Sequence, residues 1–348
     1  MVARSQGHRR DAELGTKTHS NRRRQRSNAP ENRRRKERGM AGKYTLGWIG
    51  LGRMGYAIAY RLAKNGCDIS VWNRTSSKAE PLGEHGAKVV KKITDLADRD
   101  IVFTSLSTTK DVKQVLFDKG GLLTGRIRPR LVVDTSSISD DGSAEIREQC
   151  EKMRVSYLSA PVSGNAKVVK AGKLWTVASG PKSSFTLAEP YLKMFGRGVT
   201  YVGSGELARV WKIAHNTMFG VIIQSLCEIT VLAEKAGIPR SVFLESINNS
   251  VLGSMYTRYK APALVNLDFA VTFTPKLLLK DMDLGMNAGR KYGVTMPAAA
   301  ATRESIASVV GRGYEDMDFS VLIVELAKAA ALEMKPENVK VSDGLSES

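Results

Sequence analysis

A glycine-spaced turn near the start of the chain is the feature that most restricts its fold. The stretch from Thr45 reads TLGWIGLGRMG, in which an apolar run leads into Gly50, Gly52 and Gly55 with GxGxxG spacing. In such a turn the first glycine permits a tight bend, the second lets a pyrophosphate approach the backbone, and the third lets the helix pack closely on the strand. The spacing predicts a strand, a turn and a helix that bind a dinucleotide.

The residues that follow complete a strand–helix–strand unit. A helix is expected over residues 54–64, because apolar residues recur there at helical spacing and Asn65-Gly66 provides a stop. A second strand is expected over residues 69–72. Further elements alternate along the chain: strands near 101–105 and 131–134, a helix around 111–117, and a helix from Asp140 capped by Ser139. This alternation predicts an α/β fold with a Rossmann-type parallel sheet.

The end of the second strand bears on the choice of dinucleotide. It reads Asn73-Arg74-Thr75 and has no acidic residue to bond both ribose hydroxyls. Arg74 offers a planar fork of donors suited to a 2′-phosphate, and Asn73 and Thr75 add neutral partners. We therefore expect NADP(H) to be preferred, with NAD(H) as the alternative cofactor if Arg74 is simply a solvated surface arginine.

Other cofactor contacts are expected from the turn and from the loops after later strands. The full set comprises the turn residues Gly50, Leu51, Gly52, Arg53, Met54 and Gly55, and the loop residues Leu106, Ser107 and Ser137. Ser136, beside Ser137, is expected to face the substrate. Ordinary turn chemistry is the alternative explanation for these serines.

Charge is concentrated at the start of the chain. The formal net charge is +18, and residues 1–42 hold 13 Lys/Arg and 4 Asp/Glu with almost no large apolar residues. We expect residues 1–42 to be a disordered basic arm. It could be a nucleic-acid-binding tail, an organelle transit peptide, or translated sequence upstream of a true start at Met40. Nucleic-acid binding elsewhere in the chain is not expected.

Cysteine usage and hydropathy exclude several classes of protein. Cys67, Cys150 and Cys227 lack CxxC or Cys/His ligand spacing, so neither a disulfide framework nor a metal site is expected. A reducing, cytoplasmic compartment fits this usage. The apolar stretch 217–233 is interrupted by Gln224 and Glu228, so it indicates a buried helix and no membrane span is expected.

Four blocks in order resemble the 3-hydroxyisobutyrate dehydrogenase family, also called the β-hydroxyacid dehydrogenases. They are GLGRMGYAIAYRLAKNG followed by VWNRT, SAPVSG at 159–164, GSGELARVWKIAHN at 203–216, and FTPKLLLKD at 273–281. The resemblance covers about residues 43–333. Ser159, Asn165, Glu206 and Ala208 depart from the residues usual at their positions, and Asn165 is also found in a branch that resembles glyoxylate and succinic semialdehyde reductases.

The resemblance implies roles for several residues. Lys212 and Asn216 match the family's catalytic pair, and their spacing places both on one face of a helix expected over 206–236. Lys280 is implied to reach the cofactor. Ser163, Gly164, Asn165 and Phe273 are expected at the substrate, the first three as a carboxylate site. His215 is the alternative candidate for the acid/base role. The alternative explanation for Lys212 is an ordinary solvated lysine on a helix, with no catalytic role.

The implied activity is reversible hydride transfer between NADP(H) and a small 3-hydroxyacid or semialdehyde, in a homodimer or homotetramer. Lys212 would exchange the proton of the alcohol, because a desolvated lysine near another cation has a lowered pKa. Two other functions remain open. One is an imine reductase-like NADPH enzyme, and the other is a non-catalytic binding protein that uses the arm on nucleic acid.

The expected organisation has two domains between flexible ends. A nucleotide-binding domain is expected over 43–204 and an all-helical domain for substrate and dimerisation over 205–334. Helical patterns in the second domain cover 242–248, 276–291, 298–310 and 320–334, separated by Pro239, Pro262, Pro275 and Pro297. Residues 335–348 are polar and expected to be disordered.

Overall fold

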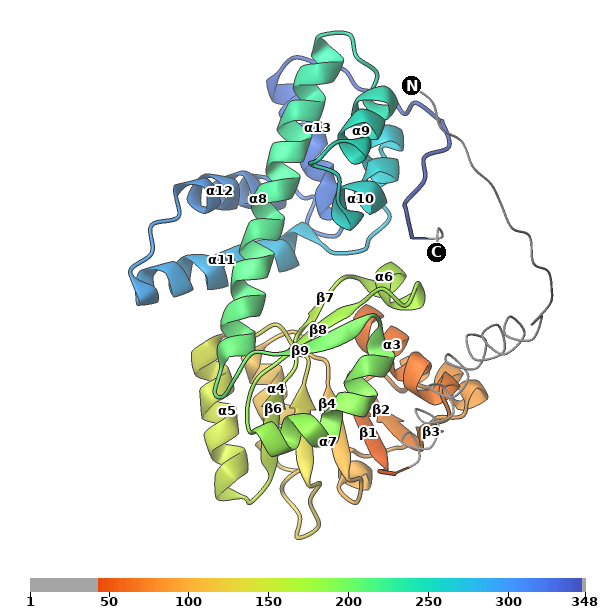
Figure 1. Cartoon of the computed structure of the whole chain (residues 1–348), viewed down its shortest axis with the longest axis vertical. Coiled ribbons are helices and arrows are strands. Elements are labelled where there is room, and N and C mark those ends of the chain that lie inside the picture. The colour runs from red at the N-terminus through yellow and green to blue at the C-terminus, as the bar shows by residue number, and fades with distance from the viewer. Residues whose placement is uncertain (1–42, 346–348) are drawn as a thin grey trace, which may run out of the picture.

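The computed structural model describes residues 43–345, which form a sheet-containing lobe and a helical lobe joined by one long helix (Figure 1). The expected basic arm, residues 1–42, lies outside the described residues, as do residues 346–348.

Six parallel strands form the main sheet, in the order β3-β2-β1-β4-β5-β6. Their bounds are β1 Leu46–Ile49, β2 Ile69–Trp72, β3 Lys88–Val89, β4 Ile101–Thr104, β5 Leu131–Asp134 and β6 Ser156–Ser159. This order is that of a Rossmann sheet, so the predicted fold class is confirmed. In the register, Ile49 at the end of β1 lies opposite Trp72 and Thr104 at the ends of its two neighbours. The glycine turn therefore opens at the edge where ligands bind in such sheets.

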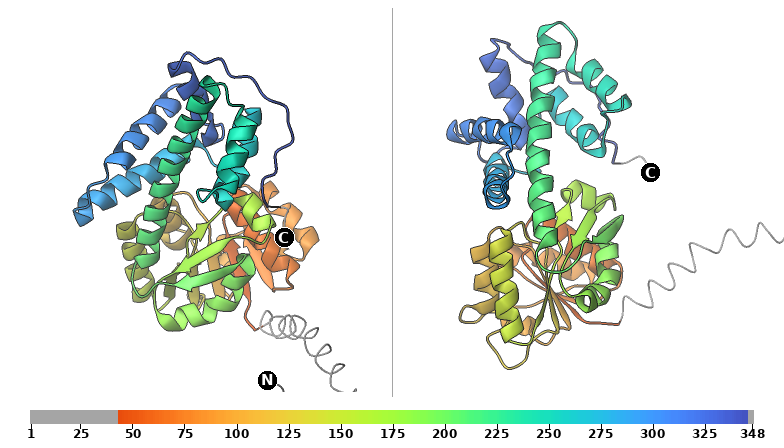
Figure 2. Two further views of the ribbon diagram at one scale, coloured as in Figure 1. Left: turned by 45° about the horizontal axis from the view of Figure 1, so that its top comes forward. Right: turned by 60° about the vertical axis from the view of Figure 1, so that its left-hand side comes forward.

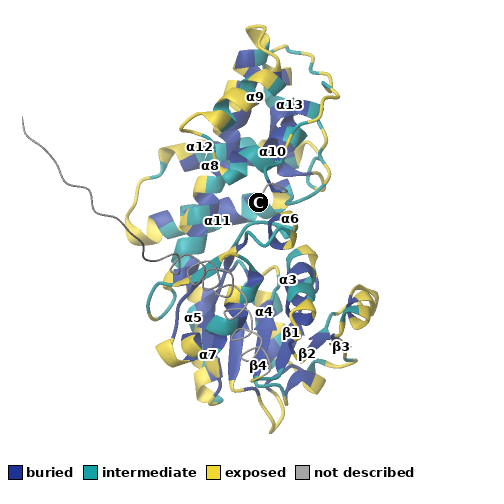
Figure 3. Ribbon diagram, turned by 45° about the vertical axis from the view of Figure 1, so that its right-hand side comes forward, coloured by how far each residue is buried: buried dark blue, intermediate teal, exposed yellow. Residues whose placement is uncertain are grey.

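Helices cover both faces of the sheet (Figure 2). They are α3 Arg53–Lys64, α4 Thr109–Phe117, α5 Asp140–Lys152, α6 Ala166–Lys170 and α7 Lys182–Leu192. α3, α6 and α7 pack in one hydrophobic cluster with the sheet, and α4 and α5 pack in another. Every residue of β1, β4 and β5 is buried, as expected for parallel strands covered on both sides (Figure 3). Short 3-10 helices occupy Ser76–Lys78, Glu80–His85 and Ile93–Leu96, with a fourth at Lys193–Phe195.

A second, three-stranded sheet was not predicted. It contains β7 Val162–Ser163, β8 Trp175–Ala178 and β9 Gly198–Tyr201 in the order β7-β8-β9. β7 is antiparallel to β8, and β8 is parallel to β9. Strands this short carry almost no period-two alternation, so the sequence gives little signal for them. The sheet matters for the site because β7 presents Ser163.

Helices form the other lobe around α8, Leu207–Lys235. The others are α9 Arg240–Asn249, α10 Met255–Asn266, α11 Pro275–Tyr292, α12 Pro297–Gly311 and α13 Leu322–Ala329, with a 3-10 turn at Phe319–Val321. The prediction that Pro262 separates helices is wrong, since Pro262 lies inside α10. A capping box at Ser254 and a buried face that includes Leu264 stabilise this helix across the proline. The last predicted helix also ends earlier, at Ala329.

α8 is long and apolar enough to cross a membrane by length and composition alone. In the protein it is the central helix of the fold, and 56% of its most apolar window is buried. It packs against α11, α12 and α13 in the helical lobe and against α5 and β8 in the other (Figure 1). α8 therefore serves as the core helix that links the lobes.

The segment after α13 is ordered where it is described, so the prediction of disorder is wrong for residues 335–345. Three backbone carbonyls of the segment accept hydrogen bonds from the rest of the chain: Lys335 O from Arg240 (2.5 Å), Val339 O from Asn266 (2.9 Å) and Gly344 O from Lys173 (3.1 Å). Leu345 is buried in a core cluster of the sheet-containing lobe. Composition could not reveal this, because the groups that hold the segment lie on elements far away in the sequence.

Candidate active site

The glycine turn has the shape that a pyrophosphate needs. Gly50 has φ +95°, and a Cβ there would lie 2.4 Å from the Ser105 carbonyl oxygen. A Cβ on Gly55 would lie 2.0 Å from the Gly50 carbonyl oxygen, whereas one on Gly52 would meet no atom of residues 43–345 within 4 Å. α3 follows Gly52 directly, and no side chain in the described part of the protein caps its first amides. Those amides and the open space at Gly52 fit a dinucleotide phosphate.

The ribose side of the turn is organised by Asn73. Its Oδ1 accepts a hydrogen bond from the Leu51 amide at 2.8 Å, and its Nδ2 donates to the Thr75 carbonyl at 2.9 Å. Arg74 is exposed and makes no hydrogen bond or ion pair with the other described residues. The guanidinium thus stays available to a ligand, while Asn73 fixes the backbone that carries it.

A cavity of about 650 Å³ lies between the two lobes. Its wall contains the following predicted site residues: Gly52, Arg53, Met54, Leu106, Ser107, Ser136, Ser137, Ser163, Gly164, Asn165, Lys212, Asn216, Phe273 and Lys280. Those outside the wall are Gly50, Leu51 and Gly55, buried within the turn, and Asn73, Arg74 and Thr75 at the ribose side. The structure thus brings most of the predicted cofactor and substrate residues to one cavity.

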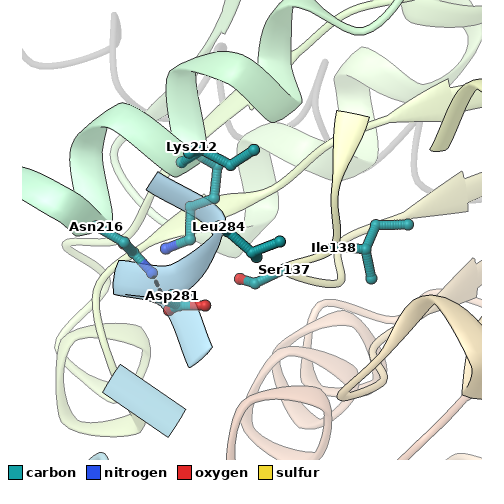
Figure 4. Close-up of a pocket in the computed structure, with 7 residues that line it drawn as sticks. Ser137, Ile138, Lys212, Asn216, Asp281 and Leu284 are labelled. Carbon is teal, nitrogen blue, oxygen red and sulfur yellow. Dashed lines mark hydrogen bonds between the residues drawn. The ribbon is translucent and has the colours of Figure 1, made fainter. Parts of the chain in front are cut away.

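Lys212 projects from α8 into this wall. Its Nζ donates to the Val162 carbonyl at 2.7 Å, which ties the helix to β7. The pKa of Lys212 is lowered to about 8, mainly because the surrounding protein desolvates the amine; Asp281 opposes the shift and Lys280 adds to it. Figure 4 shows the amine beside the Asn216 amide and the Asp281 carboxylate. An amine with this pKa can both give and take a proton near neutral pH.

Asn216 and Lys280 are connected through Asp281. Asn216 Nδ2 donates to Asp281 Oδ2 at 2.5 Å, and Lys280 Nζ lies 2.9 Å from Asp281 Oδ1. Lys280 Nζ also donates to the Ser137 carbonyl at 2.7 Å, on the loop after β5. α11 therefore holds Asn216 and the β5 loop in a fixed relation to Lys212.

Ser163 contacts a residue that sequence reasoning considered only as a rival base. Ser163 Oγ lies 2.9 Å from His215 Nε2, and His215 Nδ1 lies 2.9 Å from Asn216 Oδ1. Gly164 has φ +131°, and neither its amide nor that of Asn165 donates to another described residue. Asn165 caps α6 with its side chain. These amides, with the Ser163 hydroxyl, could bind an anion.

The Ser136 hydroxyl is already used within the protein. It donates to Asp134 Oδ1 at 2.5 Å and accepts from the Leu106 amide at 2.9 Å. It therefore joins the loops after β4 and β5 at the cavity wall. Ser136 still lines the cavity, so its place at the substrate stays a prediction.

Sequence reasoning missed Arg209, which is fully buried and pairs with Asp134. Its NH2 lies 2.6 Å from Asp134 Oδ2 and its NH1 donates to the Ser136 carbonyl. The sequence shows an arginine three positions before Lys212 on the same helix, but the partner of Arg209 lies far away in the sequence. Arg209 fastens α8 to the β5 loop one turn from Lys212.

Aromatic side chains of the helical lobe form another part of the wall. Besides Phe273 these are Phe219, Tyr256, Tyr259 and Phe319. Phe273 is held in place because Asp318, paired with buried Lys260 at 2.6 Å, also accepts from the Thr272 amide next to it. Only Phe273 was expected from the sequence, since the packing of the helical lobe could not be derived.

Comparison with known proteins gives two family matches that together span residues 45–326. The NAD binding domain of 6-phosphogluconate dehydrogenase matches residues 45–203, and the NAD-binding domain of NADP-dependent 3-hydroxyisobutyrate dehydrogenase matches residues 203–326. The boundary between them falls just before α8.

Curated relatives and solved structures agree with these matches. Glyoxylate/succinic semialdehyde reductase 2, chloroplastic, of Arabidopsis thaliana is 30% identical over 83% of this chain and 81% of its own length. Glyoxylate/succinic semialdehyde reductase 1 of the same plant is 30% identical over 80% and 96%. The 3-hydroxyisobutyrate dehydrogenase of Mycobacterium tuberculosis, solved with L-serine, superposes with a TM-score of 0.71 at 26% identity, covering 81% of this chain and 99% of that one.

The glycine turn, the interlobe cavity and the lysine-bearing helix are thus found in a chain whose two lobes both match dehydrogenase models. NAD(P)-binding regions are present, and the named relatives are reductases and dehydrogenases of hydroxyacids. The chain belongs to the β-hydroxyacid dehydrogenase family, NAD(P)-dependent oxidoreductases that act on the CH–OH group of their substrates.

Proposed function

We propose that this enzyme interconverts a small semialdehyde and its hydroxyacid with NADP(H), using Lys212 as the acid/base. The main support for this function is that the Lys212 amine lies in the cavity wall and has a pKa lowered to about 8. The nicotinamide, when bound, supplies or accepts the hydride. The chain must then supply the proton and hold the substrate.

Lys212 can supply that proton without moving far. One of its N–H bonds is held by the Val162 carbonyl, which leaves its other two hydrogens for a substrate oxygen. During reduction the ammonium donates a proton to the oxygen as the alcohol forms. During oxidation the neutral amine accepts it back. Asn216 orients the same oxygen without titrating.

The substrate carboxylate is assigned to Ser163 with the amides of Gly164 and Asn165. Support comes from the free amides, the positive φ of Gly164 and the place of all three residues in the cavity wall. Lys280 faces the cofactor side, because its amine bonds the Ser137 carbonyl on the β5 loop. Phe273 and its aromatic neighbours close the apolar side.

NADP(H) is proposed as the preferred cofactor because Arg74 is exposed and unpaired among the described residues. Arg74→Ala is expected to lower kcat/KM for NADPH about 10-fold to 100-fold, the loss of a charge-assisted hydrogen bond, with little change for NADH. Arg126→Ala, which alters another exposed arginine, is the control. Steady-state kinetics with both cofactors measure the effect, and an equal loss with NADH would contradict the assignment.

The substrate is proposed to be a short semialdehyde of the kind that the Arabidopsis relatives are named for, glyoxylate or succinic semialdehyde. The test is a panel scored by kcat/KM with NADPH: glyoxylate, succinic semialdehyde, tartronate semialdehyde and a cyclic imine, with 3-hydroxyisobutyrate and serine in the oxidising direction. We expect a carboxylate-bearing aldehyde to rank first. Preference for the imine would favour an imine reductase, and NADPH binding without any turnover would favour a non-catalytic binding protein.

Assembly as a homodimer or homotetramer, in the cytoplasm, is part of the proposal. Large exposed apolar side chains on the helical lobe support self-association: Met218, Leu232, Val242, Val251 and Leu252. Buried free cysteines at positions 67, 150 and 227 agree with a reducing compartment. Light scattering of the purified chain would measure the oligomer.

A further inference from the structure

A row of hydrogen-bonded side chains runs along the cavity wall from α11 to β7. It begins at Asp281, continues through Asn216 (2.5 Å) and His215 (2.9 Å), and ends at the Ser163 hydroxyl (2.9 Å). Of these groups, His215 has no part in the proton exchange assigned to Lys212. Its position between Asn216 and the proposed carboxylate site suggests a different task.

The direction of each hydrogen bond follows from the end of the row. Asp281 is paired with Lys280, so its carboxylate accepts from Asn216 Nδ2. Asn216 must then present its oxygen to His215, which fixes a proton on His215 Nδ1. In the neutral imidazole, Nε2 is therefore an acceptor, and the Ser163 hydroxyl must donate to it. The Ser163 proton then points at the histidine and not at a ligand.

Protonation of the imidazole reverses the last bond. An imidazolium carries a proton on Nε2 as well, so Nε2 donates to Ser163 Oγ. The Ser163 proton becomes free to donate to an anion in the cavity. Protonation of His215 strengthens anion binding in a second way, because a positive charge then lies next to the Ser163 hydroxyl that binds the anion.

We propose that His215 is a positioning residue whose protonation turns the Ser163 hydroxyl into a donor for the substrate carboxylate, so that binding a carboxylate-bearing substrate takes up one proton. The inference rests on the proposed function, because it needs Ser163 to face the substrate carboxylate. It assigns affinity for the carboxylate to His215 and leaves the exchange of the reacting proton to Lys212.

The surroundings of His215 set the pH range of this effect. Desolvation and the Lys212 ammonium lower the pKa of His215, while the bond to Asn216 and the charge of Asp281 oppose the shift. Lys280 and Asp281 come from α11, and β7 contributes the Ser163 hydroxyl. Two further cations, Lys173 and Arg197, line the same cavity. Trp211 stacks on the imidazole at 4.9 Å between centroids and helps to hold its plane.

The pKa of His215 is lowered from its ordinary value. In the ligand-free enzyme the imidazole is neutral at pH 7, and an anion beside Ser163 favours the imidazolium. Binding of the carboxylate therefore becomes weaker as pH rises above the pKa of His215 in the free enzyme, by about tenfold per pH unit. The affinity becomes level once the pH exceeds the pKa of His215 in the complex. A neutral substrate gains nothing from the proton and should show no such dependence.

The test measures KM for succinic semialdehyde and for butanal, which lacks the carboxylate. The range is about pH 5 to 8, which spans the ordinary pKa of an imidazole. For the wild-type chain we expect KM for succinic semialdehyde to rise with pH while KM for butanal stays level. His215→Gln keeps an amide donor toward Ser163 at every pH, so it should flatten the succinic semialdehyde profile. His215→Phe should raise KM for succinic semialdehyde about 10-fold to 100-fold, far more than it lowers kcat. His85→Gln, in the other histidine of the described residues, is the matched control.

Two outcomes separate the inference from the function that it rests on. Full activity in Lys212→Ala would overturn the proposed function, whatever the histidine variants do. If Lys212 proves essential but wild type and His215→Gln share the same pH profile of KM, the role of His215 is overturned. If butanal is not turned over, the pH profiles of KM for succinic semialdehyde in wild type and His215→Gln still decide. A wild-type KM for succinic semialdehyde that stays level with pH contradicts the inference without any variant.

Discussion

Lys212→Ala is expected to lower kcat about 10²-fold to 10⁴-fold, the usual contribution of a positioned acid/base. The alanine variant retains the glycine turn and the Arg74 side of the cofactor site, so Kd for NADPH should change little. Lys212→Arg should lose nearly as much activity, because a guanidinium keeps the charge but does not release its proton near neutral pH. Stopped-flow absorbance of NADPH measures the rate, and NADPH fluorescence measures binding.

The matched control is Lys276→Ala, a lysine of the same lobe whose side chain is 70% exposed. It should behave as wild type. A Lys212→Ala variant that retained more than about a tenth of wild-type kcat would rule out a general acid/base role of ordinary size. A loss of NADPH binding equal to the loss of turnover would instead mean that Lys212 serves the cofactor.

Arg209→Met is expected to cause the largest loss of stability. Both Arg209 and Asp134 have fully buried side chains, and their closest N–O distance is 2.6 Å. Removing the guanidinium leaves the Asp134 carboxylate buried without its counter-charge, which costs about 3–5 kcal/mol of the free energy of unfolding. Urea denaturation followed by circular dichroism measures the change. Turnover should fall as well, because the Ser136 carbonyl loses its donor on α8.

The partly exposed pair Arg147–Glu206, at 3.0 Å, offers the control for that prediction. Arg147→Met should cost about 1 kcal/mol or less, since water screens such pairs. Combining Arg209→Met with Asp134→Asn should recover part of the loss by removing the unpaired charge. If Arg209→Met were no more costly than Arg147→Met, the buried pair would not be fastening α8 to the sheet.

Much of the sheet-containing lobe could be predicted because its signals are local. The strands at 69–72 and 131–134 are short apolar runs with turn residues beside them, and Ser139 caps α5 as expected. Elements that depend on tertiary contacts were missed. α10 continues through Pro262 because its buried face holds it, and the segment after α13 is fixed by donors on other elements, such as Arg240.

The residues of the candidate site also fall into those predicted by local spacing and those that depend on tertiary contacts. Helical spacing alone placed Lys212 and Asn216 on one face of α8, and both do line the cavity. The pairing of Arg209 with Asp134 and that of His215 with Ser163 join residues far apart in the sequence. No local pattern encodes such contacts, so they emerge only once α8 is packed against β5 and β7.

The pH dependence of kcat in both directions tests the central claim most directly. The pKa of Lys212 is lowered to about 8. Reduction requires the ammonium, so its kcat should be full below pH 8 and fall above it, whereas the kcat of oxidation requires the neutral amine and should rise through the same pH. Mirror-image profiles that cross near this pH, and that are lost from the residual activity of Lys212→Ala, are the predicted result. Profiles that run in the same sense in both directions, or that persist in Lys212→Ala, would contradict the assignment of the proton to Lys212.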